Sequence, residues 1–375
     1  MQLHIFSLDF EFLGIVEEIN DIEWIRDYYR GGDFTLNAKV NEMNISLLKK
    51  DRIIIKDRDF TEPMIIEYRQ LEENDDGDED LMVTGQSLAT RILNSRISLG
   101  RQIERGTADK VMENLLLTQS NYSPDTNRHF PNLVVDRFVK PEFTEQIEHN
   151  TMYKTLYEDF EEICMANQCG YKVSYRYESK QFYFKVYKGL DVSDSVLFSI
   201  DFDNLKDQTY IDSNDNYKNV AIVAGQGEEL DRDLVIVNDK DYAGFDRREV
   251  YIDARDIEQD TKKVTDSEGL EIDIPIKNGE NAVKLLTTRG QEKLAELVPV
   301  NSFDAKLVEN NYKYKEDFDL GYLVTVRNKN WDVEFKQRIT RIVESYSEYG
   351  RDISVTFGQE LPTIQEKLRQ RIKRG

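Results

Sequence analysis

The sequence has few cysteines and histidines, and both shortages restrict its chemistry. Its two cysteines, Cys164 and Cys169, lie close together in the segment EEICMANQCG. Two neighbouring cysteines cannot build a disulfide framework, so we expect a protein of a reducing compartment. The three histidines, His4, His129 and His149, lie far apart and lack the spacing of zinc ligands. The sequence therefore predicts no metal site.

Long hydrophobic runs and an excess of positive charge are also missing. No segment approaches the roughly 20 apolar residues of a membrane span, and the start MQLHIFSLDF lacks the basic and apolar regions of a signal peptide. Lysine and arginine number 50 against 72 acidic residues, a net charge of −22. Because this charge repels phosphate, nucleic acid is not an expected tight ligand. We expect a soluble protein without a membrane-spanning segment, made in a cytoplasm.

Common catalytic motifs are absent as well, including the Gly-x-Ser-x-Gly elbow and the Walker-type phosphate loop. An apolar stretch leads into Gly225-x-Gly227, but Leu230 occupies the third glycine position and the strand DLVIV follows, so a hairpin loop is predicted. Cys164 and His149 could form a nucleophile pair, but Cys164 falls on an apolar helix face, which favours a buried structural thiol. We predict no catalytic, cofactor-binding or metal-binding residue and no cofactor.

The sequence does contain enough apolar residues for two or three folded domains, since 39% of its 375 residues are hydrophobic and 11% are aromatic. Apolar alternation around Ile22 and Trp24, followed by a turn at Gly31-Gly32, predicts a hairpin near the N-terminus. The acidic run ENDDGDED at 73–80 lacks the ligand spacing of a calcium loop. It predicts an exposed hairpin tip.

From the segment that begins at residue 84 the apolar period becomes helical. The segment TGQSLATRILNSR predicts one helix, and Thr107 is predicted to cap a second. Prolines predict irregular structure between 124 and 141. A third helix is predicted, because Met152, Leu156, Phe160 and Cys164 recur at helical spacing along one face. We expect this helix to end at Gly170, and the alternating segment 171–187 predicts a hairpin packed on it.

Strands are predicted again from residue 218 and near the C-terminus. Residues 256–310 contain an extended piece and a helix that includes Gly290, and we interpret them as an insertion. The segment from Asp317 to Gly358 predicts three consecutive strands, with Gly321 in a turn. The last segment, PTIQEKLRQRIKRG, places apolar residues four apart among basic ones and predicts an amphipathic helix.

Several segments together resemble a known family. The segments GIVEEINDIEWIRDYYRGGDFTLNA, VTGQSLATRILNSRI, NVAIVAGQGEELDRDLVIV and DFDLGYLVTVRNKNWDVEFKQRITRIVESY occur in the order seen in baseplate hub proteins at the tail tip of siphophages and prophages. These are the tail-associated lysin-type hubs, or siphovirus tail components. The resemblance covers about residues 10–358 and rests on order and spacing. At Leu320-Gly321-Tyr322 the family typically has Leu-Gly-Asp, a departure that concerns one turn contact.

The resemblance implies an α+β, β-rich fold with two tail-tube-like β-barrel domains, an inserted α/β domain and a short C-terminal helix. The implied domains are residues 1–85 for the first barrel, 86–214 for the α/β domain, 215–255 with 311–358 for the second barrel, 256–310 for the inserted segment with its helix, and 359–375 for the basic amphipathic tail. Trp331 would fill a barrel or a subunit contact.

The resemblance also implies a structural hub that is not an enzyme. A homotrimeric ring would connect the tail tube and the distal tail protein to tip proteins, contact the C-terminus of the tape measure protein, and gate release of tape measure and DNA. DNA would pass the acidic lumen without specific binding. The basic tail would join a downstream tip fibre, lysin or receptor-binding protein, because the C-terminal lysin domain of longer relatives is expected to be absent. Such a protein is assembled in the host bacterial cytoplasm and lies at the virion tail tip.

Two other functions stay open. A tail-associated cell-wall hydrolase, either a peptidase or a muramidase, would hide a carboxylate pair in residues 86–214. A sugar-binding receptor module would expose aromatic residues in a cleft. The candidates for such a cleft are Tyr175, Tyr177, Phe182 and Tyr183. Their strict alternation favours a hairpin core instead.

Overall fold

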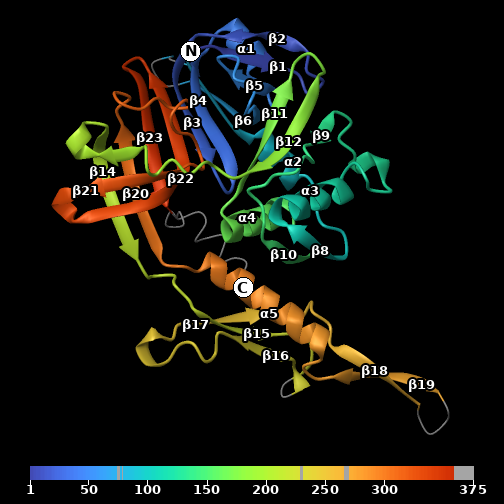
Figure 1. Ribbon diagram of the computed structural model, residues 1–375. Helices are drawn as coiled ribbons and strands as arrows, with labels where there is room; N and C mark the ends of the chain where they lie inside the picture. Colours follow the sequence, from blue (N-terminus) through green and yellow to red (C-terminus); the bar gives the residue numbers. More distant parts are fainter. Residues whose placement is uncertain (74–76, 78, 229–230, 266–269, 359–375) are drawn as a thin grey trace.

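The computed structural model describes residues 1–73, 77, 79–228, 231–265 and 270–358, and it shows a β-rich fold built on one sheet of 13 strands (Figure 1). In spatial order the main path is β14 (Leu205–Ser213), β20 (Val300–Leu307), β23 (Gly350–Gly358), β22 (Val333–Ser347), β3 (Ile19–Asp27), β4 (Gly31–Lys39), β7 (Glu79–Ser87), β6 (Met64–Glu73), β5 (Ile53–Lys56), β1 (Leu3–Phe6) and β2 (Phe12–Val16). Beside this path, β21 (Leu323–Asn328) pairs with β22, and β13 (Leu197–Ser199) pairs with β21.

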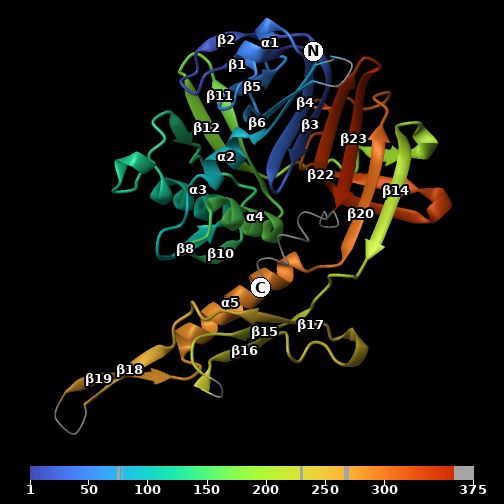
Figure 2. The same cartoon turned by 180° about the vertical axis from the view of Figure 1, so that it is seen from behind.

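The N-terminal and C-terminal parts of the chain meet in the middle of this sheet. Strand β3 pairs antiparallel with β22, from Ile22 opposite Tyr346 to Asp27 opposite Arg341. In both views the blue and red strands lie side by side (Figures 1 and 2). Strand β3 pairs with β4 along one edge and with β22 along the other, so it has no edge left to pair with β2. The sheet therefore has two ends, β14 and β2, and does not close on itself. The two closed barrels expected from the sequence are not formed by the described strands of one chain.

The predicted N-terminal hairpin is confirmed as β3 and β4. Trp24 stands opposite Phe34, and their rings stack with centroids 5.8 Å apart. Both side chains are buried with Leu36 in a core on one face of the N-terminal strands, because alternate residues of a strand point to the same face. A short helix that the sequence analysis did not predict, α1 (Glu42–Leu47), follows β4 and is capped by the Asn41 side chain.

Residues 88–187 form an α/β unit beside the main sheet, a shorter range than the expected α/β domain of residues 86–214. Its helices are α2 (Leu88–Asn94), α3 (Ala108–Gln119) and α4 (Leu156–Asn167). They pack with two small sheets, one of β8 (Arg101–Thr107) and β10 (Gln146–Met152), the other of β11 (Gly170–Arg176), β12 (Gln181–Tyr187) and β9 (Leu133–Val135). Short 3-10 turns occur at Thr126–Arg128, Ile200–Phe202, Gly244–Asp246 and Lys329–Trp331.

The predicted limits of α4 need correction at both ends. Met152 ends strand β10, and the helix starts after Thr155, which forms a reciprocal capping box with Glu158. At the other end Gln168 adopts the left-handed conformation, with φ of 52°, while Gly170 already opens β11. The prediction of a glycine at this position was wrong, because a non-glycine residue takes the left-handed turn here.

A second unit lies beneath the main sheet (Figure 2). It contains β15 (Val220–Ala224), β16 (Leu234–Val237), β17 (Glu249–Asp253), the hairpin β18 (Asp260–Thr265) and β19 (Glu271–Ile276), and helix α5 (Glu280–Glu296). Strands β15 to β17 pair only with one another among the described residues. This pairing differs from the predicted grouping of 215–255 with 311–358. Residues 197–213, expected in the α/β domain, instead pair with strands of the C-terminal part.

Gly290 sits where α5 packs closest to the small sheet beneath it. A Cβ added at this position would lie 2.6 Å from Val237 Cγ2 and 2.9 Å from Val223 Cγ2. In an exposed helix, glycine to alanine stabilises by about 1 kcal/mol. We expect Gly290→Ala to destabilise this chain instead, by about 1–3 kcal/mol, because the methyl group has no space. Urea unfolding of the variant measures the sign, and a gain in stability would contradict the close packing of α5.

Of the remaining predictions, some correspond to observed strands and others concern residues that the structure does not describe. The three strands predicted from Asp317 to Gly358 are confirmed as β21, β22 and β23, and the hairpin predicted at 171–187 as β11 and β12. Residues 74–76 and 78 of the acidic tip at 73–80, and the whole predicted tail helix at 361–375, lie outside the described residues. Among the described residues, none of the helices combines the length and apolar character that crossing a membrane requires.

Candidate functional site at the junction of the two parts

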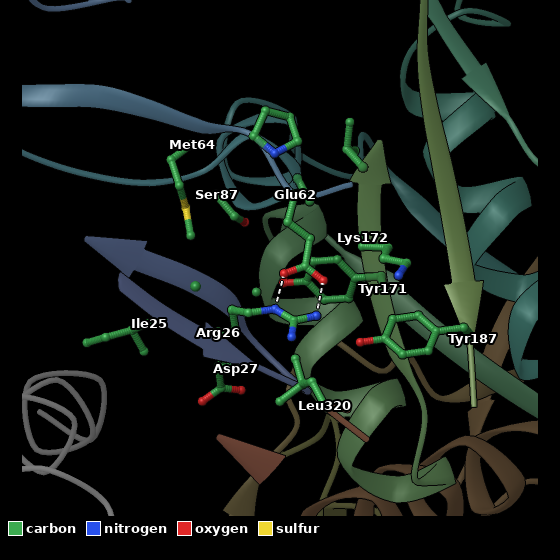
Figure 3. A pocket seen from close by; sticks show the side chains of 15 residues that line it. Ile25, Arg26, Asp27, Glu62, Met64, Ser87, Tyr171, Lys172, Tyr187 and Leu320 are labelled. Carbon is green, nitrogen blue, oxygen red and sulfur yellow. Dashed lines mark hydrogen bonds and ion pairs between the residues drawn. The ribbon is translucent and has the colours of Figure 1, made fainter. Parts of the chain in front are cut away.

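Arg26 lies at the centre of a buried ion network where the two parts of the main sheet meet. Its side chain, near the end of β3, is 4% exposed. Nη2 donates a hydrogen bond to Glu62 at 2.6 Å and Nε donates to the same carboxylate, so this pair is bidentate (Figure 3). Nη1 donates to the Tyr314 hydroxyl at 2.6 Å and to Asp319 at 2.5 Å. One guanidinium of the N-terminal part thus binds two residues of the C-terminal part.

A second buried ion pair joins β5 to β22. Lys56 Nζ lies 2.7 Å from a carboxylate oxygen of Glu344, and both side chains are almost fully buried. The ammonium also lies 5.2 Å from the ring centroid of Trp24 and 5.4 Å from that of Tyr346. Glu344 accepts further hydrogen bonds from the Tyr346 hydroxyl and from Arg351. We call the following set the junction network: Arg26, Lys56, Glu62, Asp319 and Glu344.

Partners in the junction network stabilise the charges of Glu344 and Arg26. Burial opposes ionisation of Glu344, but Lys56, Lys315 and the Tyr346 hydroxyl together outweigh it, so the pKa of Glu344 falls below its usual value. Burial would also lower the pKa of Arg26, yet Glu62, Tyr314 and Asp319 raise it well above its ordinary value. For Lys56 burial dominates and lowers the pKa. Ionised groups bound in this way hold strands in register, and they are poorly placed to transfer protons to a substrate.

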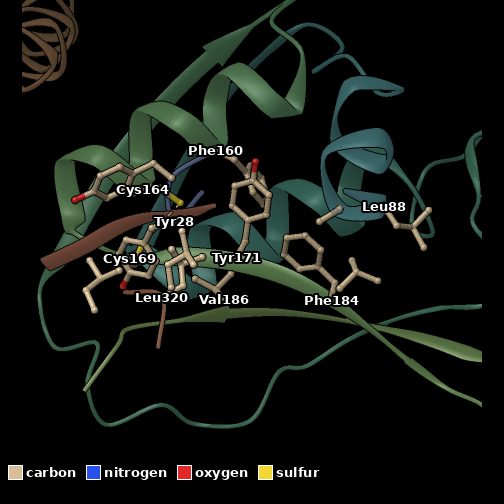
Figure 4. Packing of buried hydrophobic residues seen from close by; sticks show 14 of the residues in the cluster. Tyr28, Leu88, Phe160, Cys164, Cys169, Tyr171, Phe184, Val186 and Leu320 are labelled. Carbon is tan, nitrogen blue, oxygen red and sulfur yellow. Dashed lines mark hydrogen bonds between the residues drawn. The ribbon is translucent and has the colours of Figure 1, made fainter. Parts of the chain in front are cut away.

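Tyr28 connects this junction with the α/β unit. Its hydroxyl accepts a hydrogen bond from the Gly189 amide at 3.2 Å and lies 3.2 Å from the Gln168 carbonyl oxygen, to which it donates. Gly321 lies against its ring, and the side chain is fully buried. Figure 4 shows Tyr28 beside Cys164, Cys169 and Leu320 in the largest core cluster. Three parts of the chain therefore meet at one tyrosine.

Two cavities bear on a possible site, one at the junction and one away from it. The first, beside Arg26, has a volume of about 20 Å³ (Figure 3). It has room for little more than one water molecule, which is too small for a metabolite. The second has a volume of about 360 Å³ and lies between β10, α4 and α5. It is lined in part by His149, Glu162 and Glu292, whose ligand atoms all lie within 4.8 Å of one another, an arrangement that could hold a metal ion.

The structure separates the two residues considered as a nucleophile pair. Cys164 is fully buried, its Sγ lies 4.0 Å from that of Cys169, and burial raises its pKa well above the usual value. His149 instead hydrogen-bonds to Asp159 at 3.0 Å and lies 3.3 Å from Glu292. The prediction of a buried structural thiol is confirmed. The loop at Gly225-x-Gly227 lies between the antiparallel strands β15 and β16, so the predicted hairpin is also confirmed.

Two of the four aromatic residues considered for sugar binding belong to the core, whereas Tyr183 is half-buried and Tyr177 is exposed. Tyr175 and Phe182 are buried, and their rings lie 4.4 and 4.1 Å from that of Phe10. Tyr183 lies under the guanidinium of Arg176, at 3.9 Å. The predicted hairpin core is therefore confirmed for Tyr175 and Phe182, which pack against the N-terminal part of the chain.

The buried carboxylates of residues 86–214 have basic or hydroxyl partners. Glu113 is fully buried, with Lys140 Nζ at 2.5 Å and Lys110 Nζ at 2.8 Å. Asp159 accepts hydrogen bonds from Ser98 Oγ at 2.9 Å and Thr151 Oγ1 at 2.8 Å, besides that from His149. Asp109 is buried as well; it accepts a hydrogen bond from Thr107 Oγ1 and lies 3.7 Å from Lys110 Nζ. These contacts account for the three carboxylates as structural groups.

The junction network was not predicted from the sequence. Two signals were present, namely an arginine inside the alternating stretch DIEWIRDYY and a lysine at the end of the apolar run DRIIIK. Charged residues inside apolar strands are buried only when they are paired. Their partners Asp319 and Glu344 lie far away in sequence, so no local pattern identified them.

Comparison with solved structures gives the same fold in phage tail proteins. The tail protein from Neisseria meningitidis MC58 matches with a TM-score of 0.55 at 10% identity, over 96% of each chain. The 43 kDa tail protein of prophage MuSo2 from Shewanella oneidensis matches with 0.55 at 9% identity, over 95% of this chain and 98% of that one. The prophage tail protein gp18 from Listeria monocytogenes EGD-e matches with 0.50 at 8% identity, over 100% and 99%. These likenesses show the fold.

The sequence itself matches one family model. No curated protein matches it, but the model described as Siphovirus ReqiPepy6 Gp37-like protein matches residues 2–359. This range includes both strands of the junction, β3 and β22, and both units attached to the main sheet. The chain therefore belongs to the Siphovirus ReqiPepy6 Gp37-like family of phage tail proteins.

Proposed function

We propose that this chain is the structural baseplate hub at the tail tip of a siphophage or prophage. Three copies would form a ring that connects the tail tube and the distal tail protein to the tip proteins, and that gates release of the tape measure protein and DNA. The observation that carries the proposal is the pairing of β3 with β22, which holds two β-rich halves of one chain in a single sheet. A trimer would then arrange six such halves around a lumen. Each half would occupy the position expected for one barrel of the tail tube.

Family membership and the contents of the junction support a structural function over an enzymatic one. The match covers nearly the whole chain, and the buried charges at the junction are engaged in ion pairs between strands. In a hub these ion pairs would keep the two halves at a constant angle while the tail transmits force. The chain would not cut the cell wall. A lysin, a tip fibre or a receptor-binding protein would be its downstream partner.

The mass of the particle in solution tests the trimer. Light scattering of the purified protein over a concentration series should give three times the 44.0 kDa chain mass. With the distal tail protein added, the expected mass is that of the trimer plus its partner. Threefold rings in negative-stain images of the same sample would agree. A monomer under all of these conditions would contradict the proposed ring.

Trp331 offers a point mutation for the same test. It lies in the turn between β21 and β22 and is 46% exposed, although its ring is near Phe303. A half-exposed tryptophan is a common anchor of a protein interface. We expect Trp331→Glu to shift the trimer toward monomer by about tenfold or more in dissociation constant, equivalent to at least ~1.4 kcal/mol. Tyr122→Glu, at an exposed residue of the α/β unit, is the control and should leave the mass unchanged. Equal masses for both variants would remove Trp331 from the interface.

DNA retention tests the proposed passage. The chain carries a net charge of −22, and an acidic lumen would let the duplex slide because phosphates are repelled. Wild-type rings should therefore retain less duplex at physiological salt than a variant whose lumen-facing acids are replaced by amides. Equal retention by both would contradict a function of the charge in DNA release.

A further inference from the structure

We propose that His149, Glu162 and Glu292 form a binding site for one first-row divalent cation such as Zn²⁺. The three side chains come from β10, α4 and α5, and each offers one ligand atom within 4.8 Å of the other two. One imidazole nitrogen and two carboxylate oxygens are a donor set that suits borderline metals such as zinc.

The imidazole of His149 is already oriented as in a metal site. Its Nε2 lies 3.0 Å from Asp159, which is itself fully buried and held by Ser98 and Thr151. Its Nδ1 faces the Glu292 carboxylate at 3.3 Å. Histidine ligands commonly donate their second nitrogen to a carboxylate, which fixes the tautomer and the ring orientation. A cation would take the position of the hydrogen that now joins Nδ1 to Glu292.

The space around the three ligands suits a partly hydrated ion. They line the cavity of about 360 Å³, together with polar residues such as Thr288 and Gln291. Water molecules in this volume can complete the coordination shell. Glu162 is also bound by Lys154 Nζ, at 2.6 and 2.7 Å, but a carboxylate has lone pairs for both a lysine and a metal.

A cation at this position would connect two units of the fold. His149 and Glu162 belong to the α/β unit, whereas Glu292 belongs to the helix of the unit beneath. Apart from this cluster, the contact between them includes an ion pair of Lys284 with Glu148 at 3.3 Å. A shared metal would fasten α5 to α4 and β10. It would thereby stabilise one position of the unit that contains α5 relative to the main sheet.

Zinc titration of the untagged full-length protein tests the site. After treatment with EDTA and dialysis, calorimetry with Zn²⁺ in the presence of excess Mg²⁺ should show one bound ion per chain, because Mg²⁺ occupies nonspecific surface carboxylates. Glu292→Gln should weaken zinc affinity by about tenfold or more, and zinc should raise the melting temperature of wild type but not of this variant. His129→Ala, a histidine outside the cluster, is the control and should bind as wild type does.

Two further measurements make the outcome decisive. Circular dichroism in EDTA checks that Glu292→Gln is folded, and if it is not, Glu162→Gln is compared in the same way. X-ray absorption of the zinc complex should show a first shell of nitrogen and oxygen ligands that includes one imidazole. Equal zinc affinity in the cluster variants and wild type, or binding that excess Mg²⁺ abolishes, would overturn the proposal.

Discussion

Replacement of Arg26 by methionine is expected to lower the free energy of unfolding by about 3–5 kcal/mol. Methionine keeps much of the side-chain volume but leaves Glu62 and Asp319, which are 15% and 27% exposed, without their shared cation. The cost of uncompensated buried charge exceeds that of the lost hydrogen bonds alone. Because the partners come from both sides of the β3–β22 pairing, the loss should loosen the junction itself. Urea denaturation followed by tryptophan fluorescence measures the change, since Trp24 lies in β3.

A surface arginine and a combined variant serve as controls for this prediction. Arg91 pairs with Glu67 at 3.4 Å, and both side chains are about two-fifths exposed, so Arg91→Met should change stability by no more than about 1 kcal/mol. Adding Glu62→Gln and Asp319→Asn to Arg26→Met removes the orphaned charges and should restore part of the loss. Similar stability of Arg26→Met and Arg91→Met would show that the junction network does not hold the two halves together.

Replacement of Gly321 by alanine should cost about 3–5 kcal/mol. Two effects add at this position. The backbone has a φ of +85°, a left-handed conformation that alanine adopts at a cost, and an added Cβ would lie 2.7 Å from Tyr28 Cδ2 and closer still to Cε2. Tyr28 cannot move aside easily, because it is fully buried and its hydroxyl is hydrogen-bonded to Gly189 and Gln168.

Gly100 separates these two effects. It has a similar φ of +72°, but an added Cβ would meet no atom within 4 Å. Gly100→Ala should therefore show the backbone cost alone, about 1–2 kcal/mol. The difference between the two variants in thermal or urea unfolding is the contribution of the contact with Tyr28. If both variants lost the same stability, the packing of Gly321 on Tyr28 would be without energetic consequence.

Local patterns predicted many elements of this fold. Alternating apolar residues gave the hairpins β3–β4 and β11–β12, and helical spacing located α3 with Thr107 at its N-terminal boundary, although the Thr107 side chain makes no capping hydrogen bond. These predictions held because the period of a strand or helix is a property of neighbouring residues. The predictions were less accurate at the ends of elements, as at the C-terminus of α4. There Gln168, which is not a glycine, adopts a left-handed conformation that only the surrounding contacts stabilise.

The grouping of strands was harder to predict than the strands themselves. The expected second barrel joined 215–255 to 311–358, whereas β15 to β17 form their own sheet under α5. Alternation states which face of a strand is buried but not which partner its edge receives. The same holds for the candidate sites, since Arg26 meets Asp319, and His149 meets Glu292, only through long-range packing.

The sequence alone thus determined the net charge and apolar content of this protein and many of its local elements. Through the order of several segments it also determined the resemblance to phage tail proteins. Charge, apolar period and turn residues are readable without knowing what lies beside them. Only the tertiary structure decided that β3 pairs with β22, that buried arginine and lysine join the two halves, and that three ligand-type side chains face one cavity. Each of these depends on contacts between distant residues, whose free energy arises only when the chain has folded.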